Sequence, residues 1–153
     1  MAELRVFQSQ VRDVIAGSGV TIVQPVNLYE CELAAGVFVG PFVEIQRGVR
    51  VGERTRIQSH SFICELVAIG QDCFIGHGVM FINDLFRDGG PSKTPMEWRP
   101  TQISDRVSIG SNATILPVRI CSDVVIGAGS VVTKDIIVSG TYAGNPARRL
   151  HVM

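Results

Sequence analysis

The stretch GVFVGPFVEIQRGVRVGERTRIQSHSFI, residues 36–63, repeats one pattern every six residues. The period is marked by large apolar side chains at Val39, Ile45, Val51, Ile57 and Ile63. A helix repeats its apolar residues about every 3.6 positions and a half-buried strand every second position, so neither explains this spacing. Short strands joined by tight corners do explain it, because glycine and polar residues supply the corners.

The repeat continues in both directions along the chain. Its large apolar positions are Leu33, Val39, Ile45, Val51, Ile57, Ile63, Ile69, Ile75 and Phe81, then Ile103, Ile109 and Ile115, then Ile120, Ile126, Val132 and Val138. Four residues after most of them stands a smaller or β-branched residue, such as Val43 or Thr55, which suits an inward-facing strand position. The pattern predicts an all-β fold, a parallel β-helix whose stacked turns bury one continuous core.

Two irregularities interrupt the period. From Phe81 to Ile103 the chain takes 22 residues where six are due, which predicts an inserted loop of sixteen residues at about 84–101. Its glycines and prolines exclude a long regular element. Loops of this length are usually functional. Trp98 and Arg99 are candidates to stack on or clamp a nucleotide there, although Trp98 equally suits anchoring the loop to its own prism. The second irregularity is a step one residue short before Ile120, which predicts a tightened corner.

Composition limits the class of protein. With 46% hydrophobic residues the chain can bury a core, and we expect one domain over residues 1–153. Fourteen basic residues balance 14 acidic ones, so charge indicates neither nucleic acid nor an anionic membrane as a partner. The sequence shows no apolar run of about 20 residues and no leader-like start, so we expect a cytoplasmic protein. The four cysteines lack metal-type spacing and are expected to be buried free thiols.

Three further motifs, VSIGSNATILP (107–117), VVIGAGSVVTKD (124–135) and AGNPARRL (143–150), accompany the repeat. Together they resemble the left-handed parallel β-helix acyltransferases of the hexapeptide-repeat superfamily. The segments at 26–46 and 59–84 look most like N-acetyltransferases that act on nucleotide-linked amino sugars for surface polysaccharides. This resemblance implies left-handed winding, a homotrimer, and an acetyl-CoA site between neighbouring β-helices.

Candidate catalytic residues lie where the repeat ends. Three six-residue steps make one turn of a triangular prism, which places His77 and His60 near one corner and Asn83 at the next, where the loop leaves. His77 is a candidate proton acceptor, because imidazole ordinarily titrates near pH 6.5; a corner histidine bonded to backbone is the alternative. Asn83 is a candidate to orient the amine or a sugar hydroxyl. Asp84 either accepts a proton or holds a hydroxyl, or it simply begins the loop as a turn residue.

The resemblance also implies a set of residues that contact coenzyme A. Their positions are those of Ser111, Ala128, Thr133, Lys134 and Arg148. Ser111 and Ala128 are expected to act through backbone groups. Lys134 and Arg148 are expected to meet phosphates, which favour a cationic partner, unless they are solvated surface charges.

Two other function classes remain open at this level. An O-acetyltransferase needs a stronger base than amine transfer does, and the loop contains no histidine, which favours an amine acceptor. A non-catalytic solenoid is the second alternative. A carbonic-anhydrase-like zinc site would need three histidines, and His151 lies far along the chain from His60 and His77. We therefore expect no metal.

Overall fold

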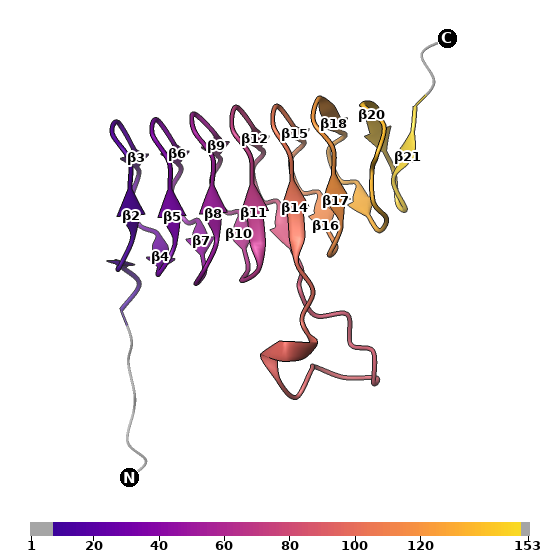
Figure 1. Ribbon diagram of the computed structural model, residues 1–153, viewed down its shortest axis with the longest axis horizontal. Helices are drawn as coiled ribbons and strands as arrows, with labels where there is room; N and C mark the ends of the chain where they lie inside the picture. Colours follow the sequence, from indigo (N-terminus) through magenta and orange to yellow (C-terminus); the bar gives the residue numbers. More distant parts are fainter. Residues whose placement is uncertain (1–7, 151–153) are drawn as a thin grey trace.

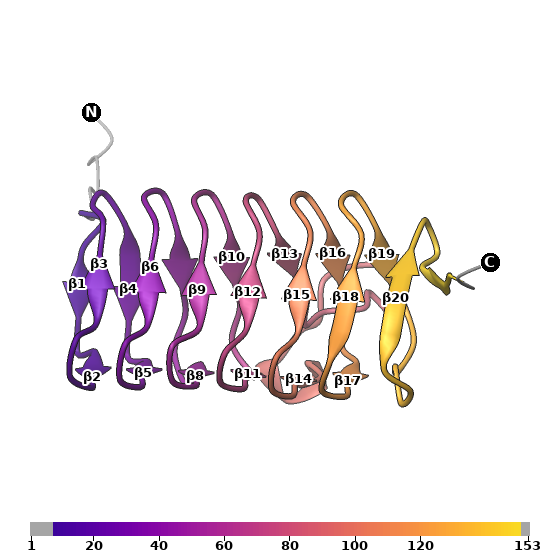
Figure 2. The same ribbon diagram turned by 90° about the horizontal axis from the view of Figure 1, so that it is seen from above.

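Short strands stack into a three-sided prism in the computed structural model, which describes residues 8–150 (Figures 1 and 2). Sheet A contains β1 (Val11–Arg12), β4 (Asn27–Tyr29), β7 (Glu44–Ile45), β10 (Phe62–Ile63), β13 (Met80–Phe81), β16 (Thr114–Ile115) and β19 (Val131–Val132). Sheet B contains β2 (Ile15–Ala16), β5 (Glu32–Leu33), β8 (Arg50–Val51), β11 (Val67–Ile69), β14 (Thr101–Ile103) and β17 (Arg119–Ile120). Sheet C contains β3 (Thr21–Ile22), β6 (Phe38–Val39), β9 (Arg56–Ile57), β12 (Phe74–Ile75), β15 (Ser108–Ile109), β18 (Val124–Ile126), β20 (Gly140–Ala143) and β21 (Arg148–Arg149).

Each turn of chain adds one strand to each sheet, in the order A, B, C, except the last turn, where a single bridge at Ile136 replaces a sheet B strand. Sheets A, B and C have seven, six and eight strands, and apart from β20 and β21, strands adjacent in a sheet come from successive turns. They pair in parallel, except that β21 pairs antiparallel with β20 at the C-terminal end. The predicted all-β solenoid is confirmed. His151, weighed above as a zinc ligand, lies outside the described residues.

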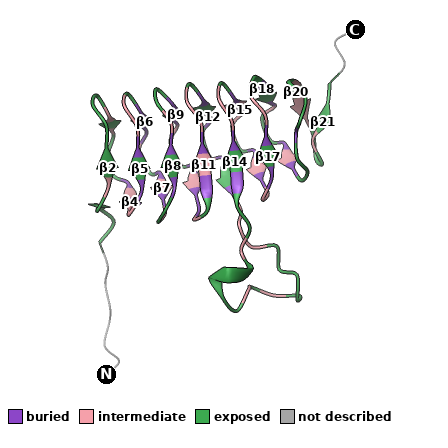
Figure 3. Cartoon of the chain, viewed as in Figure 1, coloured by how far each residue is buried: buried purple, intermediate pink, exposed green. Residues whose placement is uncertain are grey.

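The predicted register is confirmed by the strand pairing. Ile57 pairs with Ile75, and Ile75 with Ile109, so the three side chains stack along the inside of sheet C. Every large apolar position predicted from Leu33 to Val132 is buried (Figure 3). Burial of a side chain of this size contributes about 1.5–3 kcal/mol to folding stability. Each turn buries its large apolar side chains only against the turns beside it.

One predicted core position is wrong. Val138 is 47% exposed, whereas Ile136 is 5% exposed and occupies the sheet B position instead. Ile136 forms a parallel bridge to Ile120, with its amide donating to the carbonyl of Arg119. The last corner is shorter than the period requires, because pairing with the previous turn outweighs the six-residue spacing.

Polar residues at core positions have partners inside the prism. The Thr55 hydroxyl donates to the carbonyl of Gly70 at 2.8 Å and accepts from the amide of Cys73 at 3.0 Å. Ser61 donates in the same way to Gly76 at 2.8 Å. Because the hydroxyls hydrogen-bond to the next turn, burying them does not leave an unpaired polar group.

The thiols behave largely as predicted. Cys31, Cys64 and Cys73 are buried free thiols, while Cys121 is half-buried. Burial raises the pKa of Cys31 to about 11 and the pKa of Cys64 to about 12. These groups are therefore protonated near neutral pH. Within residues 8–150 no helix is long and apolar enough to cross a membrane.

Three corners join the sheets, and we name them by what they carry. The histidine corner, between sheets C and A, consists of residues 23–26, 40–43, 58–61, 76–79, 110–113 and 127–130. The arm corner, between sheets A and B, consists of residues 13–14, 30–31, 46–49, 64–66, 82–100, 116–118 and 133–135. The ion-pair corner, between sheets B and C, includes residues 17–20, 34–37, 52–55, 70–73, 104–107 and 121–123. At the ion-pair corner Arg54 binds Asp72, and Arg106 binds Asp123, across successive turns.

The predicted loop is confirmed and extends away from the prism as an arm (Figure 1). Nineteen residues, 82–100, separate β13 from β14, where three, 64–66, make the same corner one turn earlier; sixteen are therefore inserted. Its one regular element is the 3₁₀ turn η1 (Pro95–Glu97), whose first amide is capped by Thr94. Met96 is 91% exposed in this arm.

Candidate active site

Two corners, at opposite edges of sheet A, carry the predicted site residues. At the histidine corner the turn amides form a ladder along the prism. The amide of Gly78 donates to the carbonyl of Ser59 at 2.9 Å, and the amide of Asn112 donates to the carbonyl of His77 at 2.8 Å. The amide of Gly129 donates in turn to Ser111 at 2.8 Å. Ser59, His77, Ser111 and Ala128 therefore occupy equivalent positions on successive turns.

Backbone geometry explains why glycines flank His77. Gly78 has a φ of +65°, in the left-handed region where glycine has no Cβ penalty. A Cβ added at Gly76 would lie 2.7 Å from the carbonyl oxygen of Ile109 on the next turn. The close approach of the next turn thus requires glycine at position 76, whereas the position of Gly78 holds His60 and Asn112 on neighbouring turns. His77 is exposed at the edge of the prism.

The side chain of His77 has a defined partner. Its Nδ1 atom lies 2.8 Å from the hydroxyl Oγ of Ser59, one turn earlier. Ser59 was not among the predicted site residues, although it stands 18 residues before His77 and the period places it on the adjacent turn. The alternative for His77, a histidine satisfied by backbone, does not describe this side-chain contact.

His60 behaves as a corner residue. Its φ of +65° places it at the left-handed position of its turn. Its ring lies against Phe42, with 4.8 Å between ring centroids. The position equivalent to His60 on the next turn is Gly78, so His60 and His77 are neighbours in the chain's path but not equivalent in the stack.

Asn83 lies at the arm corner, at the base of the arm. Its side-chain amide donates to the backbone carbonyl of Glu65 at 3.2 Å. Its backbone carbonyl accepts from the backbone amide of Arg99 at 2.9 Å. The first contact joins the base of the arm to the previous turn of the prism, and the second joins the two ends of the arm to each other. The amide donor of Asn83 is thus engaged in the structure, while its Oδ1 atom remains an available acceptor.

Asp84 holds the arm in shape. Its carboxylate accepts from the amide and the hydroxyl of Ser92 at 2.7 and 2.8 Å, and from the amide of Phe86 at 3.0 Å. The backbone hydrogen bond from Ser92, followed by that from Phe86, lowers the pKa of Asp84 below its usual value. Of the two roles weighed for Asp84, the geometry supports that of a turn residue, because hydrogen bonds to the charged form disfavour proton uptake.

The predicted coenzyme A residues are distributed over both corners and the C-terminal end. Ser111 and Ala128 lie beside His77 on the histidine corner, whereas Thr133 and Lys134 lie on the arm corner of the last turn. Arg148 begins β21, and its guanidinium donates to the carbonyl of Ala147 at 3.0 Å. Among residues 8–150 neither Lys134 nor Arg148 forms an ion pair. Both cations are exposed at the C-terminal end of the prism and suit a phosphate-bearing ligand.

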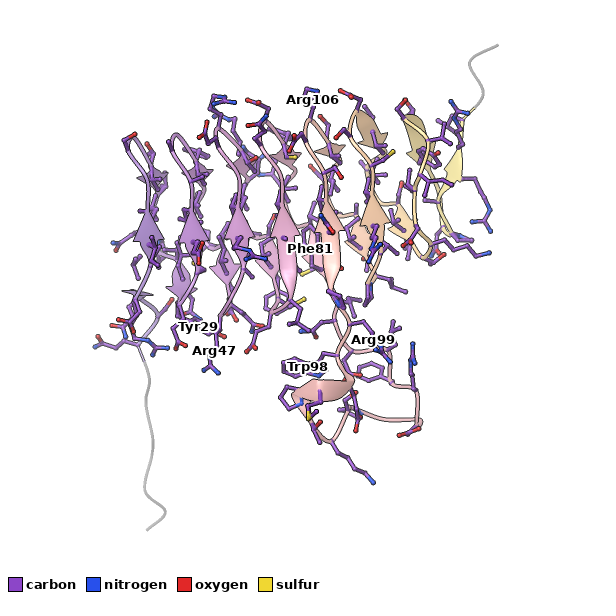
Figure 4. The ribbon with its side chains drawn as sticks, in the orientation of Figure 1. Tyr29, Arg47, Phe81, Trp98, Arg99 and Arg106 are labelled. Carbon is purple, nitrogen blue, oxygen red and sulfur yellow. The ribbon has the colours of Figure 1, made fainter. Side chains whose placement is uncertain are left out.

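Two hollows lie away from the candidate catalytic residues. An open hollow of about 790 Å³ follows the outer face of sheet B, and one of about 430 Å³ is framed by the arm. Of the candidate residues, Arg99 lines the arm hollow, whereas none of the catalytic or coenzyme A candidates lines either hollow. Figure 4 shows Trp98 and Arg99 in the arm, below the prism. The candidate catalytic residues therefore lie outside both hollows, and His77 is exposed at the prism edge.

His77 and Asn83 are not brought together within one chain. Asn83 stands six positions after His77, and β13 of sheet A runs between their corners. An extended segment of that length spans up to about 20 Å. A proton acceptor must lie within hydrogen-bond reach of the group it deprotonates, so these two side chains contact different parts of a ligand or belong to different copies of the site.

Known proteins share both the repeat and the fold. The family model of the hexapeptide repeat of succinyl-transferase matches residues 100–134. The bifunctional protein GlmU of Thermotoga petrophila is 38% identical over 99 residues, which are 64% of this chain and 20% of GlmU. The chain thus spans about a fifth of the length of the curated relatives it matches.

Two solved structures extend the comparison. A hexapeptide-repeat acetyltransferase of Vibrio cholerae O1 biovar eltor, solved with acetyl coenzyme A, is 26% identical with a TM-score of 0.66, covering 76% of this chain and 68% of that one. A mutant perosamine N-acetyltransferase of Caulobacter crescentus, solved with coenzyme A and GDP-perosamine, is 21% identical with a TM-score of 0.65, covering 94% and 58%. The second likeness shows a shared fold.

The six-residue repeat, the three-sided parallel prism and these likenesses agree with the motifs in the sequence. The chain carries the hexapeptide repeat over residues 100–134, and its fold is the left-handed parallel β-helix.

Proposed function

We propose that this protein is an acetyl-CoA-dependent N-acetyltransferase that acts on the amino group of a nucleotide-linked amino sugar for surface polysaccharide biosynthesis. The observation that carries the proposal is the histidine corner, where the exposed His77 stands in line with Ser111 and Ala128 and is held by Ser59. The Vibrio cholerae relative with acetyl coenzyme A supports the donor. The GDP-perosamine complex of the Caulobacter crescentus enzyme supports the acceptor class.

Acetyl transfer to an amine makes modest demands that this edge can meet. The amine attacks the thioester carbonyl, the carbon–sulfur bond breaks, and the nitrogen must lose one proton. His77 is the side chain placed to take that proton. Because the arm, residues 82–100, contains no histidine, the chain offers no second imidazole there for a hydroxyl acceptor. An amine acceptor is therefore favoured over an O-acetyltransferase.

The donor is assigned to the C-terminal part of the prism. Ser111 and Ala128 offer backbone groups on the histidine corner, and the exposed Lys134 on the arm corner and Arg148 in β21 offer cations for phosphates. Thr133 precedes Lys134 on the arm corner. This assignment follows the superfamily resemblance and fits the absence of ion pairs at both cations among the described residues.

The working form is proposed to be a homotrimer with the site between neighbouring prisms. Two features of the single chain support this: His77 and Asn83 lie on different corners, and neither residue lines the hollow on sheet B or the hollow framed by the arm. The exposed arm adds apolar side chains, including Phe86 at 57% exposure and Met96 at 91%. An adjacent copy would bring a histidine corner against an arm corner.

The test is product analysis by mass spectrometry. The protein is incubated with acetyl-CoA and a panel of UDP- and dTDP-linked amino sugars, each beside the parent sugar in which a hydroxyl replaces the amine. Acetylation of an amino sugar and not of its hydroxy counterpart is the expected result. Acetylation of hydroxy sugars alone would establish an O-acetyltransferase, and no product from any acceptor would favour a non-catalytic solenoid.

A further inference from the structure

The two ring nitrogens of His77 have different surroundings. Nδ1 lies 2.8 Å from Oγ of Ser59, whereas Nε2 has no hydrogen-bond partner among residues 8–150. Because the side chain is exposed at the prism edge, Nε2 is the nitrogen available to a ligand. Which nitrogen carries the proton of the neutral ring therefore decides whether His77 can accept one from the ligand side.

A serine hydroxyl can take either role toward Nδ1. If Ser59 donates, the neutral ring carries its proton on Nε2, and the available nitrogen cannot accept another. If Ser59 accepts from Nδ1–H, the lone pair is on Nε2. Only the second arrangement also suits the charged ring, because imidazolium donates from both nitrogens. The same hydrogen bond then serves before and after proton uptake.

The surroundings leave this choice to the serine. The turns of the histidine corner hold no Asp, Glu, Lys or Arg among the described residues. On the turn before His77 the titratable neighbour is His60, whose ring packs against Phe42. On the turn after it the corner residues are the uncharged Ser111 and Asn112. No carboxylate of this corner is placed to orient the imidazole, so the Ser59 hydroxyl is its orienting group.

We propose that Ser59 is a positioning residue that accepts a hydrogen bond from Nδ1–H of His77 and so keeps Nε2 unprotonated for the acceptor amine. The inference rests on the proposed function. As the amine nitrogen bonds to the acetyl carbon, the sulfur leaves with the carbon–sulfur electron pair. The amine proton moves to Nε2, and His77 then passes it to the thiolate or to water. Nδ1–H stays bonded to Ser59 throughout.

Nuclear magnetic resonance of the full chain with ¹⁵N-labelled histidine rings tests the hydrogen bond directly. Spectra are recorded at a pH where the rings are neutral, and His77→Gln identifies the His77 signals. The wild type is expected to carry its proton on Nδ1. Ser59→Ala should move the population toward Nε2–H, and Ser59→Thr should restore it. A wild-type ring protonated on Nε2, or a tautomer unchanged in Ser59→Ala, would overturn the proposal.

Kinetics with the best acceptor supply the second readout. Ser59→Ala should lower kcat by about threefold to tenfold, the net worth of one hydrogen bond, with the KM for acetyl-CoA unchanged. Ser59→Thr should recover the rate. Ser122→Ala, at the half-buried serine of the ion-pair corner, is the matched control and should match wild type. An unchanged kcat in Ser59→Ala contradicts this inference alone. Absence of acetyl transfer by the wild type contradicts the proposed function. In that case the tautomer measurement still decides whether Ser59 accepts from Nδ1–H of His77.

Discussion

Single residues at the two corners have different expected roles, because their contacts differ. His77 is held through one ring nitrogen by Ser59 at 2.8 Å, so its other nitrogen is available for proton transfer. The side-chain amide of Asn83 donates to the carbonyl of Glu65 at 3.2 Å, which fixes the side chain. Its Oδ1 atom is then the group expected to position the acceptor. The loss of rate on removing the proton acceptor should therefore depend on pH, whereas the loss on removing the positioning group should not.

The first prediction compares His77→Ala with Asn83→Ala. His77→Ala should slow the reaction near neutrality by about a hundredfold, the low end for a general base, and recover as the amine becomes deprotonated at higher pH. Asn83→Ala should lower the acceptor kcat/KM at every pH with little change in coenzyme A affinity. Profiles of rate against pH for both variants make the measurement. Wild-type activity of His77→Ala at all pH values would remove histidine from the reaction.

The second residue-scale prediction concerns Arg148. If its exposed guanidinium meets a phosphate, Arg148→Ala should weaken coenzyme A binding by about tenfold to a hundredfold, because a charge-assisted hydrogen bond is lost. Isothermal titration calorimetry measures the affinity. Arg119→Ala is the control, since Arg119 is an exposed cation on sheet B. Equal affinities for wild type and Arg148→Ala would remove Arg148 from the donor site.

The arm is the element that departs from the repeat, and a few polar contacts define it. Asn83 and Arg99 close its base at 2.9 Å, and Asp84 holds Ser92 and Phe86. No large buried side chain lies within residues 85–100. Its conformation therefore depends on hydrogen bonds to one carboxylate rather than on a core of its own.

Acid should loosen the arm before the prism unfolds. The pKa of Asp84 is lowered in the folded chain, first by the backbone hydrogen bond from Ser92. The stabilisation from the Asp84 carboxylate is therefore complete above the usual aspartate pKa of 3.8, and it is lost as pH falls through the lowered pKa. Trp98 is the chain's one tryptophan and lies in the arm, so its fluorescence reports this element. We expect an emission change in acid that Asp84→Asn already shows at neutral pH.

The neighbouring Asp88→Asn serves as the control, because Asp88 is exposed in the same arm. It should keep the wild-type emission at neutral pH. Emission from Asp84→Asn that equals wild type at neutral pH would show that the carboxylate does not hold the arm.

At the scale of the whole molecule, the prism presents its site residues along edges instead of enclosing them. Each turn buries its apolar residues against the next, so the described core is continuous from end to end. The arm extends away from its own prism (Figure 1). In the proposed homotrimer, a second copy would complete a pocket at this edge.

Mixed trimers test this assembly. His77→Ala and Asn83→Ala chains are co-expressed, and light scattering measures the mass of the resulting protein assembly. We expect the mass of a trimer. If each site takes its histidine from one chain and its asparagine from the next, about a quarter of the sites in random mixtures are intact, because the interface is heterologous. Activity of that order is expected where each variant alone is impaired. A monomeric mass, or no recovery on mixing, would contradict a shared site.

The sequence by itself determined the features that repeat. Its six-residue period predicted the parallel prism, the buried positions from Leu33 to Val132, the sixteen-residue insertion, and the corners of His77 and Asn83. These follow from nearest-neighbour stacking, in which each turn meets the same local requirement as the last. Local pattern is therefore sufficient to place them.

Only the tertiary structure decided the features that do not repeat. These are the contact of Ser59 with His77, the hydrogen bonds of Asp84 within the arm, and the replacement of Val138 by Ile136 in the core. Each depends on where a side chain points or where the chain bends back. A six-residue period does not encode either property. Spacing predicts which corner a residue occupies, whereas its partner there is set by the three-dimensional path of the chain.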